Sequence, residues 1–279
     1  MAIKKNNNQG KDNIKNIAYY QKKFWKLFFI GLAGIGLFFL FASWGLFGSM
    51  PSFEDLENPD SNLATEIISA DGVVLGKYFQ KNRSQLKYAD LPKNLVQALV
   101  ATEDARFYEH SGIDGRGTLR AISSLGTSGG ASTLTQQLAK QLFHGEGSKF
   151  LPFRIVQKVK EWIIAIRLER QYTKNEIIAM YCNVYDFGNN SVGVSSAAKT
   201  YFSKEPKDLT INESAILVGM FKNSGLYNPI RNPQGVINRR NVVFSQMEKG
   251  KIISEKEKER LQSLPLKLNF KLETHKEGT

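Results

Sequence analysis

The most informative segment of the chain is Ala101-Thr-Glu-Asp-Ala-Arg-Phe-Tyr-Glu-His-Ser-Gly-Ile-Asp114, which gathers acids, aromatic rings and a histidine around a glycine. Glu103 directly follows Leu99-Val100-Ala101, so its local surroundings are apolar. Partial burial makes a carboxyl group a better base. Alone, such a glutamate is more often an ordinary exposed acid at a helix end, and the signal becomes specific only within the full motif. Its neighbour Asp104 could orient it or bind a cation.

A second cluster begins about twenty residues later with Gly129-Gly-Ala-Ser-Thr-Leu-Thr-Gln-Gln137 and continues to Lys140. The two glycines free the backbone, and the hydroxyl, amide and ammonium groups that follow suit a ligand made of sugar and phosphate. Ser and Thr are also common at helix starts, where they cap the first turn. A ligand site and a capped helix start are compatible interpretations, because the N-terminus of a helix can itself bind phosphate.

A third cluster lies in the helix expected over residues 154–171. Ile155, Val159, Trp162, Ile163 and Ile166 are expected to line one side of this helix. Another face carries Arg154, Lys158, Glu161 and Ala165 at positions i, i+4, i+7 and i+11, with Lys160 beside it. Two cations around one carboxylate and a small alanine favour a pocket floor, although a solvated face of ion pairs has the same pattern.

The N-terminal region contains a membrane-span candidate. Residues 27–53 include no charged side chain, and about 20 apolar residues suffice for a helix to cross a bilayer. A signal peptide would have a shorter apolar region and a cleavage site of small residues, and a buried core helix is seldom apolar all round. We therefore expect a transmembrane helix over residues 27–49.

The charge distribution supports this topology. The net charge is +12, and residues 1–26 hold seven lysines against one acid. Lysines beside a span favour the cytoplasmic side, so residues 1–26 are expected to be a cytoplasmic basic tail. This role in orienting the span accounts for the positive charge of the tail, so binding to nucleic acid is not needed to explain it. The single cysteine, Cys182, excludes an intrachain disulfide, and the three histidines lie far apart in the sequence with no metal-ligand spacing.

The rest of the chain predicts a mainly helical domain. Residues 50–62 read as a linker, and the apolar segments around Asp71-Gly72 predict a β-hairpin. Three helix starts have the capping-box pattern: Thr173-Lys-Asn-Glu176, Thr210-Ile-Asn-Glu213 and Ser254-Glu-Lys-Glu257. Phe150-Leu-Pro-Phe153, framed by cations, suits either insertion at a bilayer surface or packing in the core.

Together, these segments resemble the signature motifs of the peptidoglycan glycosyltransferases, glycosyltransferase family 51, which form a domain of class A penicillin-binding proteins. The match includes Glu-Asp-x-x-Phe-x-x-His-x-Gly from Glu103, the 129–140 cluster and Lys158-Val-Lys-Glu161. Asn183-Val-Tyr-Asp-Phe-Gly188 and Tyr227-Asn-Pro, with Arg239-Arg240, extend it to about residues 60–255. The chain departs from the family in having Gln157 where arginine is frequent and Asp186 as an additional residue.

The resemblance implies a mainly α, lysozyme-like, two-lobed helical domain with a small β-hairpin, preceded by one N-terminal transmembrane helix. It places the glycosyltransferase domain at residues 63–255. Residues 256–279 resemble the linker that leads into a transpeptidase domain in bifunctional relatives, and we expect the chain to be truncated before such a domain.

The resemblance also implies an activity, the polymerisation of lipid II into β-1,4-linked glycan strands with inversion and release of undecaprenyl pyrophosphate. Glu103 and Glu161 are the expected catalytic residues. The expected substrate-binding residues are Asp104, Phe107, His110, Ser132, Thr133, Thr135, Gln136, Gln137, Lys140, Arg154, Lys158, Lys160 and Asn183. No cofactor is expected to be required, although Mg²⁺ or Mn²⁺ could bind at Glu161 or Asp104.

The expected setting is the bacterial cytoplasmic membrane, with a single span, a cytoplasmic N-terminus and an extracytoplasmic catalytic domain. The expected partners are lipid II, the growing glycan strand, the membrane and other cell-wall synthesis proteins. Two other classes remain open. A lytic transglycosylase or lysozyme would use a catalytic glutamate as an acid on finished polymer, and a non-catalytic membrane scaffold would need neither glutamate.

Overall fold

The structure is a computed structural model that describes residues 6–48, 50, 65–68, 74–78, 86–124, 130, 132–143 and 150–272. The chain divides into two compact units, and each is described by itself. The first contains Met1–Met50 and Phe150–Lys160, and the second contains Pro51–Lys149 and Glu161–Thr279.

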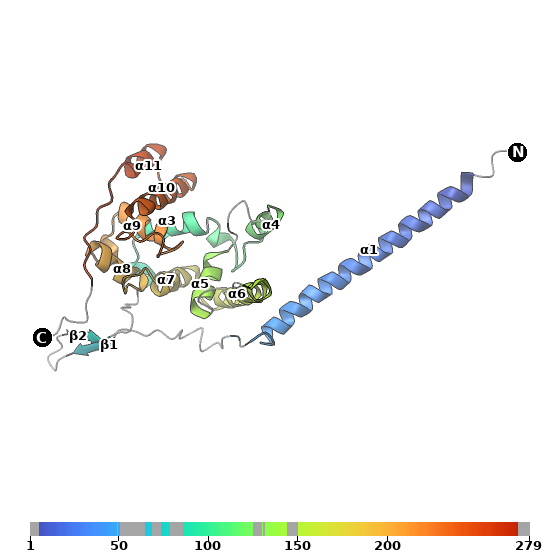
Figure 1. The fold of residues 1–279 in the computed structure, drawn as a ribbon, viewed down its shortest axis with the longest axis horizontal. Helices are drawn as coiled ribbons and strands as arrows, with labels where there is room; N and C mark the ends of the chain where they lie inside the picture. The colour runs from blue at the N-terminus through green and yellow to red at the C-terminus, as the bar shows by residue number, and fades with distance from the viewer. Residues whose placement is uncertain are drawn as a thin grey trace. The chain divides into compact units, whose positions relative to one another are not determined.

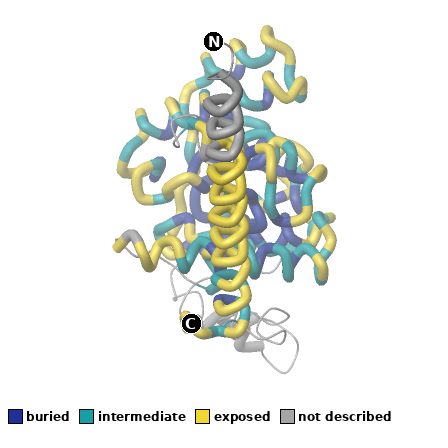
Figure 2. The backbone as a smooth tube through the Cα atoms, turned by 90° about the vertical axis from the view of Figure 1, so that its right-hand side faces the viewer, coloured by how far each residue is buried: buried dark blue, intermediate teal, exposed yellow. Residues whose placement is uncertain are grey.

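The first unit is dominated by α1 (Asn6–Ser43), a single helix of 38 residues. Its segment Ile17–Ser43 has a mean hydropathy of 2.0 over the most apolar window, and none of that window is buried (Figure 2). A core helix would be covered, so that alternative is excluded. The helix begins well before Leu27, because the lysine-rich segment continues the helical conformation of the apolar one.

The exposed aromatic pair of this unit settles one open alternative. Phe150 and Phe153 are each 62% exposed, and their rings lie 5.5 Å apart between centroids. Core packing of this pair is therefore excluded. Insertion at a bilayer surface remains the interpretation that fits two exposed rings beside Arg154.

In the second unit, the predicted hairpin is confirmed as an antiparallel pair. Strand β1 (Thr65–Ile68) pairs with β2 (Val74–Tyr78), with Thr65 opposite Tyr78. The register shifts between Ile67 and Ile68. The predicted turn at Asp71-Gly72 lies outside the described residues.

Among the residues that the structure describes, all other regular elements are helical, which confirms the predicted mainly α class. They are η1 (Tyr88–Asp90), α3 (Lys93–Glu103), η2 (Phe107–Glu109), α4 (Gly115–Ser123), α5 (Leu134–Phe143), α6 (Leu151–Gln171), α7 (Lys174–Val184), α8 (Gly193–Phe202), η3 (Pro206–Asp208), α9 (Ile211–Met220), α10 (Pro233–Lys249) and α11 (Glu255–Gln262). Helix α6 starts in the first unit and ends in the second.

Helix starts follow the predicted capping chemistry. Thr173 and Thr210 both form complete capping boxes with the glutamate three residues later. Ser254 accepts a hydrogen bond from the Glu257 backbone N–H, but the Glu257 carboxylate binds Arg260 instead of reaching back. The third predicted box is therefore only half formed.

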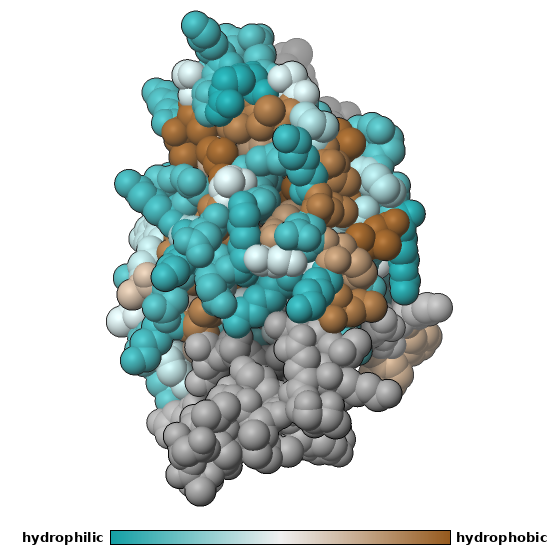
Figure 3. All heavy atoms as spheres, turned by 90° about the vertical axis from the view of Figure 1, so that its left-hand side faces the viewer, coloured by the Kyte–Doolittle hydropathy of each residue, from teal (hydrophilic) through white to brown (hydrophobic). Residues whose placement is uncertain are grey.

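The helices of the second unit form two groups (Figure 1). In one group, α10 packs against α3, α9 and α11, and α3 also packs against α9. In the other group, α7 packs against α5 and α8. Contacts between α8 and α9 join the groups. Polar side chains cover much of the face in Figure 3, with apolar ones in patches between them.

The buried side of α6 differs from the predicted one. Ile164, Ala165 and Leu168 are fully buried, and Glu161 is only 9% exposed. Of the predicted apolar side, Val159 is buried, whereas Ile155 is 52% exposed and Trp162, Ile163 and Ile166 are half-buried. The prediction was wrong for these four residues because apolar residues occur all round this helix, so their spacing selects no single face.

A buried arginine joins α10 to the C-terminal segment. Arg240 has no exposed surface, and its guanidinium donates to the carbonyls of Gln262 and Leu264 and to the side chains of Asn212 and Asn241. Burial lowers the pKa of Arg240 from its usual value. These bonds satisfy carbonyl groups at the end of α11 that the helix itself leaves unpaired.

We expect Arg240→Leu to destabilise the protein by about 3 kcal/mol, because it leaves several buried acceptors without donors. Urea unfolding of the full chain measures this change. Arg260→Leu is the matched control, because Arg260 is solvent-exposed in an ion pair with Glu257 three residues away. Equal unfolding midpoints for the two variants would contradict this role of Arg240.

Candidate active site

Glu103 is the last residue of α3, and its carboxylate is held by one residue from each helix group. Its Oε2 accepts a hydrogen bond from Gln137 Nε2 of α5 at 3.2 Å. Its Oε1 accepts one from Arg239 Nη2 of α10, also at 3.2 Å. The Glu103 side chain is 13% exposed. It is thus partly buried, as predicted, yet still reaches solvent.

Tyr181 orients the Gln137 amide. The buried Tyr181 Oη, on α7, donates to Gln137 Oε1 at 2.9 Å. Because the amide oxygen receives this bond, its NH₂ group is turned toward Glu103. Burial, and then the charge of Glu103, raises the pKa of Tyr181 well above its usual value. The hydroxyl therefore stays a neutral donor.

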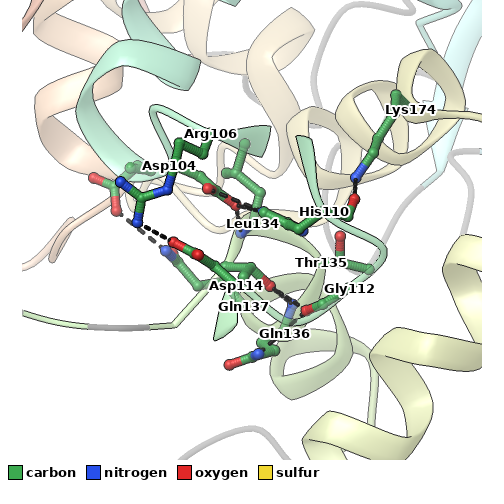
Figure 4. A network of polar contacts seen from close by, with 12 residues as sticks. Asp104, Arg106, His110, Gly112, Asp114, Leu134, Thr135, Gln136, Gln137 and Lys174 are labelled. Carbon is green, nitrogen blue, oxygen red and sulfur yellow. Dashed lines mark hydrogen bonds and ion pairs between the residues drawn. The ribbon is translucent and has the colours of Figure 1, made fainter. Parts of the chain in front are cut away.

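Asp104 links the end of α3 to the start of α5. Its Oδ2 accepts a hydrogen bond from the backbone N–H of Leu134, the first residue of α5, at 3.0 Å. The same oxygen lies 3.0 Å from His110 Nε2 (Figure 4). A carboxylate at a helix N-terminus satisfies a free N–H group and complements the helix dipole. Asp104 thereby positions the helix that carries Gln137.

Gly112 lets the loop after Glu103 approach both α5 and α6. Its φ is +87°, and a Cβ there would lie 2.9 Å from backbone atoms of Ala165. Its carbonyl accepts hydrogen bonds from Thr133 Oγ1 at 2.7 Å and Gln136 Nε2 at 3.2 Å (Figure 4). Only glycine fits this conformation and this approach.

Two other predicted residues, Thr135 and Phe107, pack with Glu169 and Lys174 against the loop. Thr135 Oγ1 donates to Glu169 of α6 at 2.5 Å. Lys174 donates to Glu169 at 2.8 Å and to the His110 carbonyl at 2.6 Å, and its ammonium lies 4.2 Å from the centre of the Phe107 ring. Thr135 and Phe107 have no exposed surface.

The loop is closed by an ion pair between Arg106 and Asp114 (Figure 4). Burial of Asp114 opposes its ionisation, but hydrogen bonds from Arg106 and from the Gly117 backbone outweigh burial and lower its pKa. The loop from Glu103 to Asp114 is thus fixed at both ends by carboxylates.

The remaining predicted residues of the second unit lie in different settings. Ser132 is half-buried just before α5, and Lys140 is exposed in its last turn. Asn183 binds both backbone polar groups of Leu86, each at 2.9 Å, and so fixes the chain ahead of α3. Asn183 therefore acts on the backbone that precedes α3 rather than on Glu103 itself.

The charged residues of α6 are divided between the units. Arg154, Lys158 and Lys160 belong to the first unit, where Lys160 Nζ donates to the Gly48 carbonyl at 3.0 Å. Glu161 belongs to the second unit. It lies one and two turns before Ala165 and Glu169, which meet Gly112 and Thr135, so Glu161 shares the face that packs against the loop and α5.

The described residues provide a poor fit for a resident divalent metal ion. In this part of the chain, no three His, Cys, Asp or Glu side chains come together as metal ligands. Asp104, one predicted ligand, already binds a backbone N–H and His110.

Arg239 and Tyr181, which orient the Glu103 carboxylate and the Gln137 amide, were not among the site residues predicted from the sequence. Arg239 contacts Glu103 across 136 sequence positions, and Tyr181 contacts Gln137 across 44. The signal for Arg239 was the Arg239-Arg240 pair within the family resemblance. Its two members have opposite roles, since Arg239 faces Glu103 and Arg240 faces α11.

Several known proteins have sequences similar to this one. The sequence profile of the transglycosylase family matches residues 71–248, more than half of the chain. The chain is 38% identical over 221 residues to penicillin-binding protein 1A of Vibrio cholerae, covering 78% of this chain and 26% of the relative. It is 39% identical over 203 residues to penicillin-binding protein 1A of Escherichia coli K12, covering 71% and 23%.

The chain therefore belongs to the transglycosylase family, and the resemblance to the glycosyltransferase domain of class A penicillin-binding proteins is confirmed. It spans about a quarter of the length of these relatives. A crystal structure of penicillin-binding protein 1A from Haemophilus influenzae matches with a TM-score of 0.44 and 25% identity, covering 77% of this chain and 22% of that one. This score is too low to support an argument about the fold.

We expect Gly112→Ala to destabilise the protein by about 1–3 kcal/mol, because alanine is strained at positive φ and its methyl group meets the α6 backbone. Thermal unfolding of the full chain measures the loss. Gly115→Ala is the control, since a methyl group at Gly115, the first residue of α4, would meet no other atom within 4 Å. Equal melting temperatures for both variants would contradict the packing described.

Proposed function

We propose that this chain is a peptidoglycan glycosyltransferase, which polymerises lipid II into β-1,4-linked glycan strands and releases undecaprenyl pyrophosphate. Membership in the transglycosylase family supports the reaction class. The carrying observation is the carboxylate of Glu103, partly exposed and held by donors from both helix groups.

In the proposed reaction, Glu103 is the general base. It takes the proton from the 4-hydroxyl of the acceptor sugar, whose oxygen attacks the anomeric carbon of the donor and inverts it. Gln137 and Arg239 fix the direction of the carboxylate, so that it is positioned before substrate arrives. Asp104, His110, Thr133, Thr135, Gln136 and Phe107 would act by holding this arrangement, because they contact other protein groups.

The leaving pyrophosphate gains negative charge, which cations stabilise. Lys140 in the second unit and Arg154, Lys158 and Lys160 in the first are the proposed candidates. Glu161 would orient such cations. A divalent ion that arrives with the pyrophosphate is compatible with this proposal, and adding Mg²⁺ to a polymerisation assay tests it.

The membrane setting is also proposed. Segment Ile17–Ser43 is long and apolar enough to cross a bilayer, and the preceding lysines favour a cytoplasmic N-terminus. The second unit would then face the outside, where a polyprenyl-linked substrate is bound at the membrane surface. Cell-wall synthesis proteins would be partners in the same compartment.

The cations of the chain favour synthesis over cleavage. A lytic enzyme acts on finished polymer and needs neither a phosphate-binding cation nor a lipid. Here Arg239 lies 3.2 Å from the Glu103 carboxylate, and Lys140 is exposed in the last turn of α5. A scaffold protein would not need this arrangement.

We expect Glu103→Gln to lower the rate of lipid II polymerisation by about 10²–10⁴-fold, because the amide cannot accept the proton. Gel analysis of labelled glycan products measures the rate. The control is Glu109→Gln, which changes an exposed acid of the same loop and should leave the rate unchanged.

Purified peptidoglycan serves as the alternative substrate in the same assay. Polymer formation from lipid II without cleavage of peptidoglycan supports the proposal. Cleavage of peptidoglycan by the unmodified chain, abolished in Glu103→Gln, would support a lytic enzyme instead. Normal polymerisation by Glu103→Gln would refute the role of Glu103.

We expect Tyr181→Phe to slow polymerisation by about three- to tenfold with little change in KM, because one neutral hydrogen bond that orients Gln137 is lost. Steady-state kinetics measures both constants. Tyr185→Phe is the control, since Tyr185 donates instead to the Met220 carbonyl at 2.7 Å. An equal loss of kcat in both variants would indicate a general loss of packing.

A further inference from the structure

A cavity of about 680 Å³ lies between η1, the outer side of α3 and the C-terminal end of α10. Helices α3 and α10 pack against each other (Figure 1). The α3 residues that line the cavity include Val96, Val100 and Ala101. At 3.6 residues per turn, this side is centred roughly a quarter turn from Glu103. Neither Glu103 nor the two residues that hold it line the cavity.

The walls of the cavity are mainly apolar. Leu91, Val96, Val100 and Ile252 supply aliphatic surface. The volume falls within the range of about 300–1,000 Å³ that is usual for small-molecule sites. Such a space suits a hydrocarbon chain, because moving apolar surface out of water lowers the free energy.

The charges at the cavity have one sign. Lys93 and Lys249 line it, and none of its lining residues carries a carboxylate. Both lysines are exposed, and neither forms an ion pair in the described part of the chain. Lys93 lies in the first turn of α3, where the helix dipole disfavours a cation unless an anion is near.

Tyr108 adds no negative charge at the cavity. Burial, and then the neighbouring Tyr88, raises the pKa of Tyr108 to about 12. Its hydroxyl is therefore neutral at physiological pH. An anionic ligand would therefore meet two ammonium groups at the cavity. No carboxylate among the lining residues would repel it.

The lining chemistry favours an amphiphile over a peptide. A peptide backbone brings N–H and C=O groups that need partners when buried. Beyond the tyrosine hydroxyls and the lysines, the lining side chains offer only Gln97 and Gln246 for that purpose. A hydrocarbon chain has no such requirement, and a single anionic head can remain at the lysines.

We propose that this cavity binds a single-chain amphiphile with an anionic head group, of the long-chain carboxylate class. Its hydrocarbon chain lies along Val96, Val100 and Ile252, and its head group meets Lys93 and Lys249. The site shares α3 with Glu103 but is independent of the proposed glycosyl transfer. Its binding can therefore be tested whether or not the chain polymerises lipid II.

The test uses the full chain in phosphatidylcholine nanodiscs and a long-chain carboxylate that carries a photoreactive diazirine. After irradiation, mass spectrometry maps the labelled peptides. We expect labelling in residues 88–108 and 246–252, competed by unmodified dodecanoate. A chain-matched diazirine amine should label these segments at least tenfold less, because its head group is repelled.

Two variants locate the site without altering the core. Lys93→Glu/Lys249→Glu reverses the exposed charges, and Ala105→Trp fills the cavity from an exposed position that lines it. We expect each to reduce labelling of the two segments at least tenfold. Lys207→Glu, an exposed lysine on η3, is the control and should have no effect.

Unchanged labelling of these segments in both variants would overturn the proposal, as would equal labelling by the carboxylate and the amine. Absence of any labelling in residues 88–108 and 246–252 would also overturn it. Melting temperatures of the variants equal to that of the unmodified chain show that a loss of labelling arises from the site itself.

Discussion

The two hydrogen bonds to the Glu103 carboxylate are the interaction on which the site depends. One comes from α5 and the other from α10, so each helix group supplies one donor. A glutamate side chain has several rotatable bonds, and two donors on its two oxygens restrict them. The position of the proposed base is therefore set by the packing of the two helix groups. A shift of one group relative to the other would move one of the two donors and so displace the carboxylate.

The loop after Glu103 maintains that arrangement. Asp104 binds the first N–H group of α5, and the Gly112 carbonyl binds two side chains around the start of the same helix. Because α5 carries Gln137, these contacts fix the donor as well as the loop. The positive φ of Gly112 permits the close approach to α6 that completes the packing. Several polar residues of the motifs therefore position the loop and α5, which carries Gln137.

Much of the secondary structure and part of the candidate site could be predicted from the sequence, because their signals are local. The N-terminal apolar helix, the hairpin pairing and two complete capping boxes followed from local patterns. Glu103 could be proposed as the base because its motif is contiguous in the sequence. The buried side of α6 was missed because its apolar residues surround the helix. Arg239 was missed because only the packing of α10 against α3 brings it to Glu103.

A double-mutant cycle between Glu103 and Arg239 tests the central claim most directly. Polymerisation rates are measured for the unmodified chain, Arg239→Gln, Glu103→Gln and the double variant. If Arg239 acts by positioning the Glu103 carboxylate, Arg239→Gln slows the unmodified chain but causes no further loss in the Glu103→Gln background. An equal loss in both backgrounds would show that the two side chains act independently, and would contradict the account.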